Sequence, residues 1–262
     1  MKAQHVVVAM VIWGTLVLSS GTHATEPISE RTLFHDIYKE LVETNTSHSA
    51  GDTTLAAQRM EQRLRDAGFS ATEVQVIEPF PKKGNLVVRF PGGGTRRPLL
   101  LLAHLDVVEA KREDWQTDPF TLVETDGYFT ARGAADDKAM AAAFVSILCQ
   151  LTREGFTPHR DLILALTADE ERGGVSTNGA RWLTQTHREW LDAEFGLNEG
   201  GGGELINGKP TIQRIQVAEK IYTTYELGMD GVLMCFLSYY EDTVRFGAEI
   251  VPLLQQLGVV TH

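Results

Sequence analysis

Two short segments are apolar at every position, and they constrain the fold more than any other feature of the chain. Residues 99–103 read Leu-Leu-Leu-Leu-Ala, and residues 162–166 read Leu-Ile-Leu-Ala-Leu. A strand that is apolar on both faces is typical of the middle of a sheet that helices cover on both sides. Helical spacing occurs before and between these strands. The alternation predicts an α/β fold, a three-layer sandwich with a mostly parallel central sheet.

Capping residues delimit the predicted helices. Ser29 precedes residues 30–44, which have an apolar stripe at Leu33, Ile37, Leu41 and Val42. Asp52 precedes a second helix that Gly68 closes, and its inward residues are predicted to be Leu55, Met60 and Leu64. A third helix is predicted at residues 138–154. Strands are predicted at residues 73–77, 85–90 and 195–197, and a hairpin at residues 122–124 and 128–131.

Charge and cysteine content exclude two classes of function. The formal net charge is −11, which argues against a nucleic-acid partner because phosphate binding needs a basic face. The two cysteines, Cys149 and Cys235, are too few and too isolated for a zinc ribbon or a disulfide scaffold. Cys149 lies in an apolar helical pattern, so we expect a buried free thiol there.

The N-terminus has the pattern of a secretion signal. Lys2 supplies the positive start, residues 6–18 are almost entirely apolar, and Thr22 and Ala24 have the small side chains of a cleavage site. We expect residues 1–24 to be removed after Ala24 and the chain to be secreted or periplasmic. The alternative is an uncleaved membrane anchor, but the apolar run is short for a bilayer span, so no stable anchor is expected.

Polar clusters follow both apolar strands. His104 and Asp106 come directly after the first, and Asp169, Glu170 and Glu171 come directly after the second. In open α/β sheets, ligands gather at the carboxyl ends of the strands. Acids left unpaired there are costly, and metal ions that bind carboxylates would offset that cost. The alternative for the second cluster alone is a solvated acidic loop.

Two further acidic positions fit the same edge of the sheet. Asp136 and Asp137 are adjacent, and two adjacent carboxylates repel each other unless a cation intervenes. The alternative is a helix cap, which we expect of Asp137 because a helix begins at Lys138. Glu199 follows the strand predicted at residues 195–197, where the alternative is a plain turn.

Taken together, the order of these clusters resembles that of the M20 metallopeptidases. Neighbouring residues add to the resemblance, namely Trp115, the run Asp-Pro-Phe at residues 118–120, and Arg132 with Gly133. The resemblance covers roughly residues 29–227. It implies a zinc-peptidase-like fold that binds two zinc ions per chain.

The resemblance also implies a role for each candidate ligand. Asp136 is the carboxylate that bridges both ions, and His104 and Glu199 complete the first metal site. Glu171 serves the second site. The ligands are therefore predicted to be one imidazole and three carboxylates.

Two more residues have catalytic roles by the same resemblance. Asp106 orients His104, and Glu170 is the general base that deprotonates the attacking water and passes the proton to the leaving amine. The reaction implied is hydrolysis of an amide bond in a peptide or an N-acyl amino acid.

The chain departs from the family pattern after Leu227. The family continues into a lid domain that begins with a Gly-Gly-His-Ser-like stretch, and a last histidine then binds the second metal. Residues 228–262 contain no such stretch, and their only histidine is His262. We therefore divide the chain into a signal peptide at residues 1–24, a catalytic domain at residues 25–227 and a divergent tail at residues 228–262.

We interpret this departure as a truncation or a shifted reading frame that removes the lid and dimerisation domain. The expected consequences are weak binding of the second zinc ion, low or no peptidase activity and a doubtful homodimer. A non-catalytic metal-binding remnant is the main alternative to an active enzyme. A third possibility, a peptide-binding or structural protein without metal, leaves the acidic clusters unexplained.

Overall fold

A five-stranded sheet forms the centre of the molecule. The computed structural model describes residues 29–172, 174–199, 202–206 and 209–214. The strand order is β1 (Val74–Ile77), β2 (Asn85–Phe90), β6 (Arg160–Thr167), β3 (Arg96–His104) and β7 (Phe195–Leu197). Strands β6, β3 and β7 are parallel to one another. Strand β2 pairs antiparallel with β6 on one side and with β1 on the other. The predicted α/β architecture is confirmed, with a mixed sheet whose parallel half contains both apolar strands.

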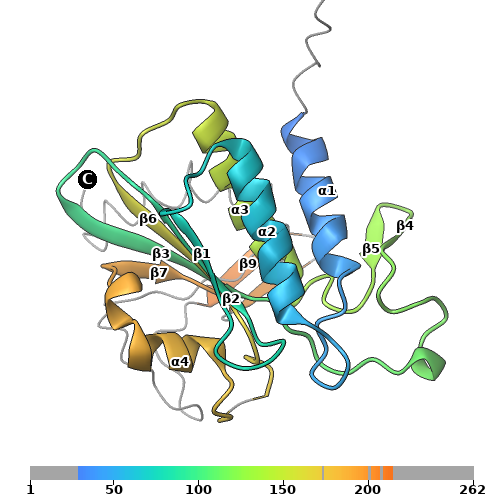
Figure 1. Ribbon diagram of the computed structural model, residues 1–262. Coiled ribbons are helices and arrows are strands. Elements are labelled where there is room, and N and C mark those ends of the chain that lie inside the picture. Colours follow the sequence, from blue (N-terminus) through green and yellow to red (C-terminus); the bar gives the residue numbers. More distant parts are fainter. Residues whose placement is uncertain (1–28, 173, 200–201, 207–208, 215–262) are drawn as a thin grey trace, which may run out of the picture.

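Helices cover both faces of this sheet. Helices α1 (Glu30–Val42), α2 (Thr53–Ala67) and α3 (Lys138–Arg153) lie on one side, and α4 (Gly179–Thr186) lies on the other (Figure 1). Two 3-10 turns, η1 (Arg112–Asp114) and η2 (Arg188–Trp190), lie in the connections. The arrangement is the sandwich that the sequence predicts.

The predicted caps delimit the first two helices. The Ser29 side chain accepts a hydrogen bond from the Thr32 amide, and the Asp52 side chain accepts one from the Leu55 amide. Gly68 closes α2 at φ +119°, a conformation that favours glycine because it has no Cβ. The helix starts were therefore predictable from local chemistry.

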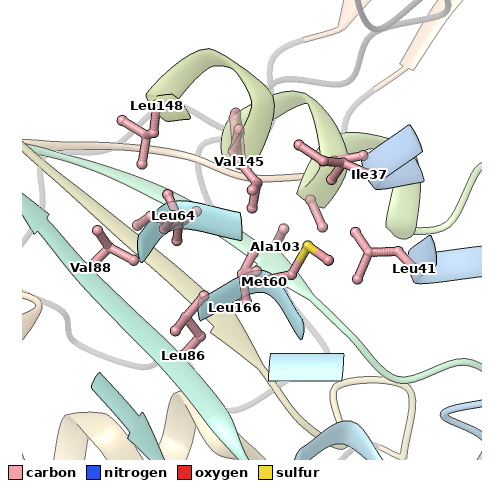
Figure 2. Close-up of a cluster of buried hydrophobic side chains, with 14 of the residues drawn as sticks. Ile37, Leu41, Met60, Leu64, Leu86, Val88, Ala103, Val145, Leu148 and Leu166 are labelled. Atoms are coloured by element: carbon pink, nitrogen blue, oxygen red, sulfur yellow. The ribbon is translucent and has the colours of Figure 1, made fainter. Parts of the chain in front are cut away.

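Side chains of the two apolar strands alternate between two cores. Leu101, Leu164 and Leu166 face helices α1 to α3, where Ile37, Met60, Leu64 and Val145 pack (Figure 2). Leu100, Ile163 and Ala165 face the other side, where α4 contributes Leu183. This alternation follows from the two-residue period of a strand, and it explains why both segments are apolar throughout.

The prediction that Leu55 points inward is wrong. Its side chain is 41% exposed, whereas Met60 and Leu64 of the same helix are fully buried. Five residues separate Leu55 from Met60, which places it about 140° away around a helix of 3.6 residues per turn. The buried positions near the start of α2 are taken by Ala56 and Ala57 instead.

The remaining elements are two small antiparallel pairs. Strands β4 (Val123–Thr125) and β5 (Tyr128–Thr130) form the predicted hairpin, and β8 (Gly202–Ile206) pairs with β9 (Lys209–Arg214). Cys149 is a buried free thiol, as predicted, and burial raises its pKa to about 11. Among the described residues, no helix is both long and apolar enough to cross a membrane. The predicted signal peptide, Cys235 and the predicted divergent tail lie outside the described residues.

Two leucines of α2 give a matched test of this core. Leu64→Ala should lower the free energy of unfolding by about 2–5 kcal/mol, because it removes a fully buried side chain and leaves a cavity. Leu55→Ala should change it by less than about 0.5 kcal/mol. Urea unfolding followed by circular dichroism measures both, and equal losses would contradict the packing of α2.

Candidate metal centre

Three parallel strands deliver polar side chains to one edge of the sheet. His104 is the last residue of β3, Glu170 and Glu171 follow β6, and Glu199 follows β7. Because β6, β3 and β7 are parallel, their carboxyl ends meet at the same edge. Asp136 reaches this edge from the turn before α3. All six predicted site residues lie within the described residues.

The imidazole of His104 is the centre of the cluster. His104 Nε2 lies 2.9 Å from Asp136 Oδ1, 3.4 Å from Glu199 Oε1 and 3.8 Å from Glu170 Oε2. On its other side, Nδ1 lies 3.0 Å from the backbone carbonyl oxygen of Asp106. A carbonyl can only accept, so Nδ1 carries a hydrogen and donates it. This tautomer directs Nε2 toward the carboxylates.

Asp106 joins the ends of two strands. Its Oδ1 accepts the Glu170 amide at 3.0 Å, and its Oδ2 accepts the Glu171 amide at 3.1 Å. Its carboxylate lies 3.7 Å from His104 Nδ1, farther away than its own carbonyl oxygen. Asp106 therefore contacts His104 through its backbone, while its carboxylate fixes the backbone of the turn after β6.

Asp137 does not cap helix α3 as the sequence suggests. It occupies the N-cap position, but its side chain makes no capping hydrogen bond. Its Oδ2 instead accepts the backbone amide of His104 at 3.1 Å, and its Oδ1 is buried without a hydrogen-bond partner in the described part of the chain. Burial raises the pKa of Asp137 well above its ordinary value. The peptide bond between Asp136 and Asp137 is cis.

The electrostatics of the cluster favour a cation. Burial alone would lower the pKa of His104, but its hydrogen bonds to Asp136 and Glu199, together with the charges of Asp137 and Asp106, outweigh burial and raise the pKa well above its ordinary value. Burial raises the pKa of Glu170 to about 7, with the Glu199 charge adding to it. Repulsion among the acids thus makes positive charge favourable beside Nε2, and a metal ion there relieves the same repulsion.

Three residues have the chemistry and the spacing of a metal site. Ligand atoms of His104, Asp136 and Glu199 all lie within 4.8 Å of one another. One imidazole and two carboxylates suit zinc. Glu171 is not part of this group, although burial and the Asp136 charge raise its pKa, so the two carboxylates influence each other. The group of His104, Asp136 and Glu199 therefore fits a metal ion.

Comparison with known proteins identifies the family. The model of peptidase family M20/M25/M40 matches residues 100–249, more than half of the 262 residues. The chain belongs to this family. Membership of this metallopeptidase family implies a metal, so it agrees with the ligand group around His104.

The M20 relatives are hydrolases of acylated amino compounds or of peptides by name. The Homo sapiens N-fatty-acyl-amino acid synthase/hydrolase PM20D1 is 32% identical over 184 residues, which are 62% of this chain and 36% of the relative. Succinyl-diaminopimelate desuccinylase of Delftia acidovorans is 36% identical over 128 residues, 48% of this chain and 33% of the relative. The chain thus spans about a third of the length of these relatives.

A solved structure of the family has the same fold. The M20 family metallo-carboxypeptidase Sso-CP2 from Sulfolobus solfataricus matches 64% of this chain and 37% of that chain. The TM-score is 0.54 at 17% identity. A likeness at this identity supports the zinc-peptidase-like fold and carries no information on substrate.

Sequence reasoning missed two partners of the site. Asp169 was grouped with Glu170 and Glu171, but its carboxylate is fully buried and accepts a hydrogen bond from Lys83 Nζ at 2.7 Å. Lys83 lies two positions before the start of β2, and Asp169 lies 86 positions farther along the chain. No local pattern signals such a pairing. The second missed contact is that of Asp137 with the His104 amide.

Asp106→Asn tests the link between the strand ends. The amide replaces one accepting oxygen by a donor, which leaves the Glu170 or Glu171 amide unpaired in a buried place. We expect a loss of about 1–3 kcal/mol in the free energy of unfolding, measured with a chelator present so that metal binding does not contribute. The exposed Asp114→Asn is the control and should leave stability unchanged. Equal stability of both variants would refute the link.

Proposed function

We propose that this chain carries the metal-binding catalytic part of a zinc-dependent amide hydrolase. The single observation that supports this most strongly is the group of His104, Asp136 and Glu199, with a further acid, Glu170, beside it. Three ligands and a separate base are what zinc-assisted hydrolysis needs. Family membership supports the same reaction class.

His104, Asp136 and Glu199 hold the zinc ion in this proposal. Burial and the charge of Asp136 raise the pKa of Glu171, and these two carboxylates would form a second, weaker site. A zinc ion held there would supply a Lewis acid for the scissile carbonyl and would lower the pKa of the attacking water. Asp106 supports the site by holding the Nδ1–H tautomer of His104 through its carbonyl oxygen.

Glu170 acts as the general base. Its Oε2 is 3.8 Å from His104 Nε2, farther than the oxygens of Asp136 and Glu199, so it is close to the ligands without being one of them. Its carboxylate takes a proton from the attacking water. The protonated Glu170 then donates this proton to the amine nitrogen as the amide bond breaks.

The proposed substrates are N-acyl amino acids, with peptides as the alternative. The name of the human relative refers to N-fatty-acyl amino acids, and the Delftia acidovorans relative is a desuccinylase. Both names describe an acyl group on an amino compound. The amide bond is common to these compounds and to peptides, so one site chemistry serves either class.

A non-catalytic metal-binding protein is the second candidate. It is favoured by the position of Glu171 outside the ligand group and by the presence of one histidine in that group, within the part of the chain that the structure describes. Such a protein binds zinc without turnover. Zinc content and hydrolysis therefore have to be measured on the same preparation.

Zinc content tests the ligand assignment. We expect about one zinc ion to remain per chain after gel filtration, as in three-ligand zinc sites, with a second retained only in excess zinc. Asp136→Ala should abolish this retention because it removes a carboxylate from both sites. The control, Asp114→Ala, should retain zinc as the wild type does. Elemental analysis that finds no zinc in the wild type would disprove the assignment.

Glu170→Gln tests the base. We expect kcat for an N-acyl amino acid to fall about 10²–10⁴-fold because glutamine cannot accept the proton. Zinc content should stay at the wild-type value. The control is Glu189→Gln, whose side chain is 70% exposed on η2, and its kcat should not change. A wild type that binds zinc and hydrolyses neither substrate class would favour the second candidate.

We also propose that the protein acts outside the cytoplasm after removal of residues 1–24. Support comes from Lys2, the apolar run at residues 6–18 and the small residues before position 25. N-terminal sequencing of the protein recovered from culture medium or periplasm would test this, and an intact Met1 would contradict it.

A further inference from the structure

The backbone at Asp169 has an unusual conformation just before the two functional acids. Asp169 has φ +54°, in the left-handed region that residues other than glycine rarely adopt. Glu170 and Glu171 follow directly. A residue persists in such a conformation only where its surroundings hold it, and such residues gather at functional sites.

Three hydrogen bonds hold Asp169. Its Oδ1 accepts from Lys83 Nζ at 2.7 Å, and its Oδ2 accepts from the Thr177 hydroxyl at 2.6 Å. Its backbone carbonyl accepts from the Asn178 side chain at 3.2 Å. The Asp169 side chain is fully buried, and that of Lys83 is 9% exposed. We call Lys83, Asp169 and Thr177 the clamp.

The clamp ties together three segments at the same edge of the sheet. Lys83 leads into β2, Asp169 follows β6, and Thr177 stands just before Asn178, the N-cap of α4. Next to it, the Asn85 side chain accepts the Ala168 amide at 3.0 Å. The backbone on the β6 side of Glu170 is thus held from β2 and from α4.

The direction of the two acids depends on this held turn. The Glu170 and Glu171 amides both donate to the Asp106 carboxylate, and the backbone carbonyl of Asp106 accepts from His104 Nδ1. The Asp169 carboxylate points to Lys83 and is absent from the ligand group among the described residues. Asp169 therefore affects the site through the backbone, because it fixes the positions of Glu170 and Glu171.

Burial of the ion pair argues for a positional role rather than a gain in stability. Burying two charges costs desolvation free energy, and their mutual attraction often only offsets that cost. Replacing such a pair by well-packed apolar residues therefore often leaves the free energy of unfolding unchanged. An ammonium ion and a carboxylate do, however, fix each other's place. Lys83 Nζ also lies 3.3 Å from His48 Nδ1, so it is confined on two sides.

We propose that Lys83 is a positioning residue of the hydrolase, whose ion pair with Asp169 fixes the turn that presents Glu170 and Glu171. The inference rests on the proposed function, since it assigns Glu170 and Glu171 their tasks. The geometry of the clamp itself does not depend on that assignment.

Amide hydrogen exchange tests the clamp independently of metal. In Lys83→Met, exchange at the Glu170 and Glu171 amides should become at least about tenfold faster, because the turn opens locally. The matched control is Arg89→Met, which breaks the ion pair of Arg89 with Asp161 at the other end of the same two strands. That control should leave both amides as protected as in the wild type. Unchanged exchange in Lys83→Met would overturn the proposal.

Affinity for the second zinc ion, measured by competition with a chromophoric chelator, tests the functional part, because Glu171 is the proposed ligand of that ion on this turn. Lys83→Met should weaken binding of the second ion about 10–100-fold, as is usual when a residue that holds a ligand in position is lost, and Lys83→Arg should restore most of it. Arg89→Met should bind zinc as the wild type does. Faster exchange with unchanged affinity for the second zinc ion would overturn the role of Lys83 in the site while leaving the proposed function intact. A wild-type protein that binds no zinc would contradict the proposed function. The exchange data would still show whether Lys83 holds the turn at Glu170 and Glu171.

A milder variant keeps the test decisive if Lys83→Met does not fold, as judged by near-ultraviolet circular dichroism. Thr177→Val removes one donor to Asp169 and keeps the shape of the side chain. It should change exchange and the affinity for the second zinc ion in the same direction as Lys83→Met, by a smaller factor. A folded Thr177→Val protein that matches the wild type in both would overturn the proposal.

Discussion

Repulsion among the carboxylates around His104 is the constraint on which the rest of the site depends. Asp136, Glu170 and Glu199 approach the same imidazole nitrogen within 3.8 Å. Like charges this close do not all stay ionised unless a cation lies between them. The fold enforces the approach, since β6, β3 and β7 end side by side with fully buried cores behind them. A metal ion is the partner that this arrangement favours.

The other acidic side chains of the region bind specific partners and do not face His104 Nε2. Asp106 accepts two backbone amides, Asp137 accepts the amide of His104, and Asp169 pairs with Lys83. Each contact also fixes the backbone that carries a functional side chain. The acids thus divide into those that face His104 Nε2 and those that hold the first group in place, and the second group determines how accurately the first can bind a metal.

Local patterns predicted the scaffold, and contacts distant in sequence decided the details of the site. Residues 99–103 and 162–166 predicted central strands because both faces of a buried strand are apolar. Ser29, Asp52 and Gly68 predicted helix ends because each makes its capping hydrogen bonds to residues a few positions away. The pairing of Lys83 with Asp169 has no such local signal, since burial of both follows only from the folded sheet. Asp137 was mistaken for a cap because the alternative acceptor role requires His104 to lie beside it.

The same geometry bears on how many metal ions the chemistry requires. One imidazole and two carboxylates already form a three-ligand set, the number found in mononuclear catalytic zinc sites that keep an open position for water. Glu170 stands next to this set as a separate acid, so a base is present without any contribution from Glu171. Weak binding of a second zinc ion, which we propose, would therefore lower the charge stabilisation and would leave Glu170, the proposed base, in place. The place of Glu170 relative to His104, more than the number of ions, separates a hydrolase from a protein that only binds metal.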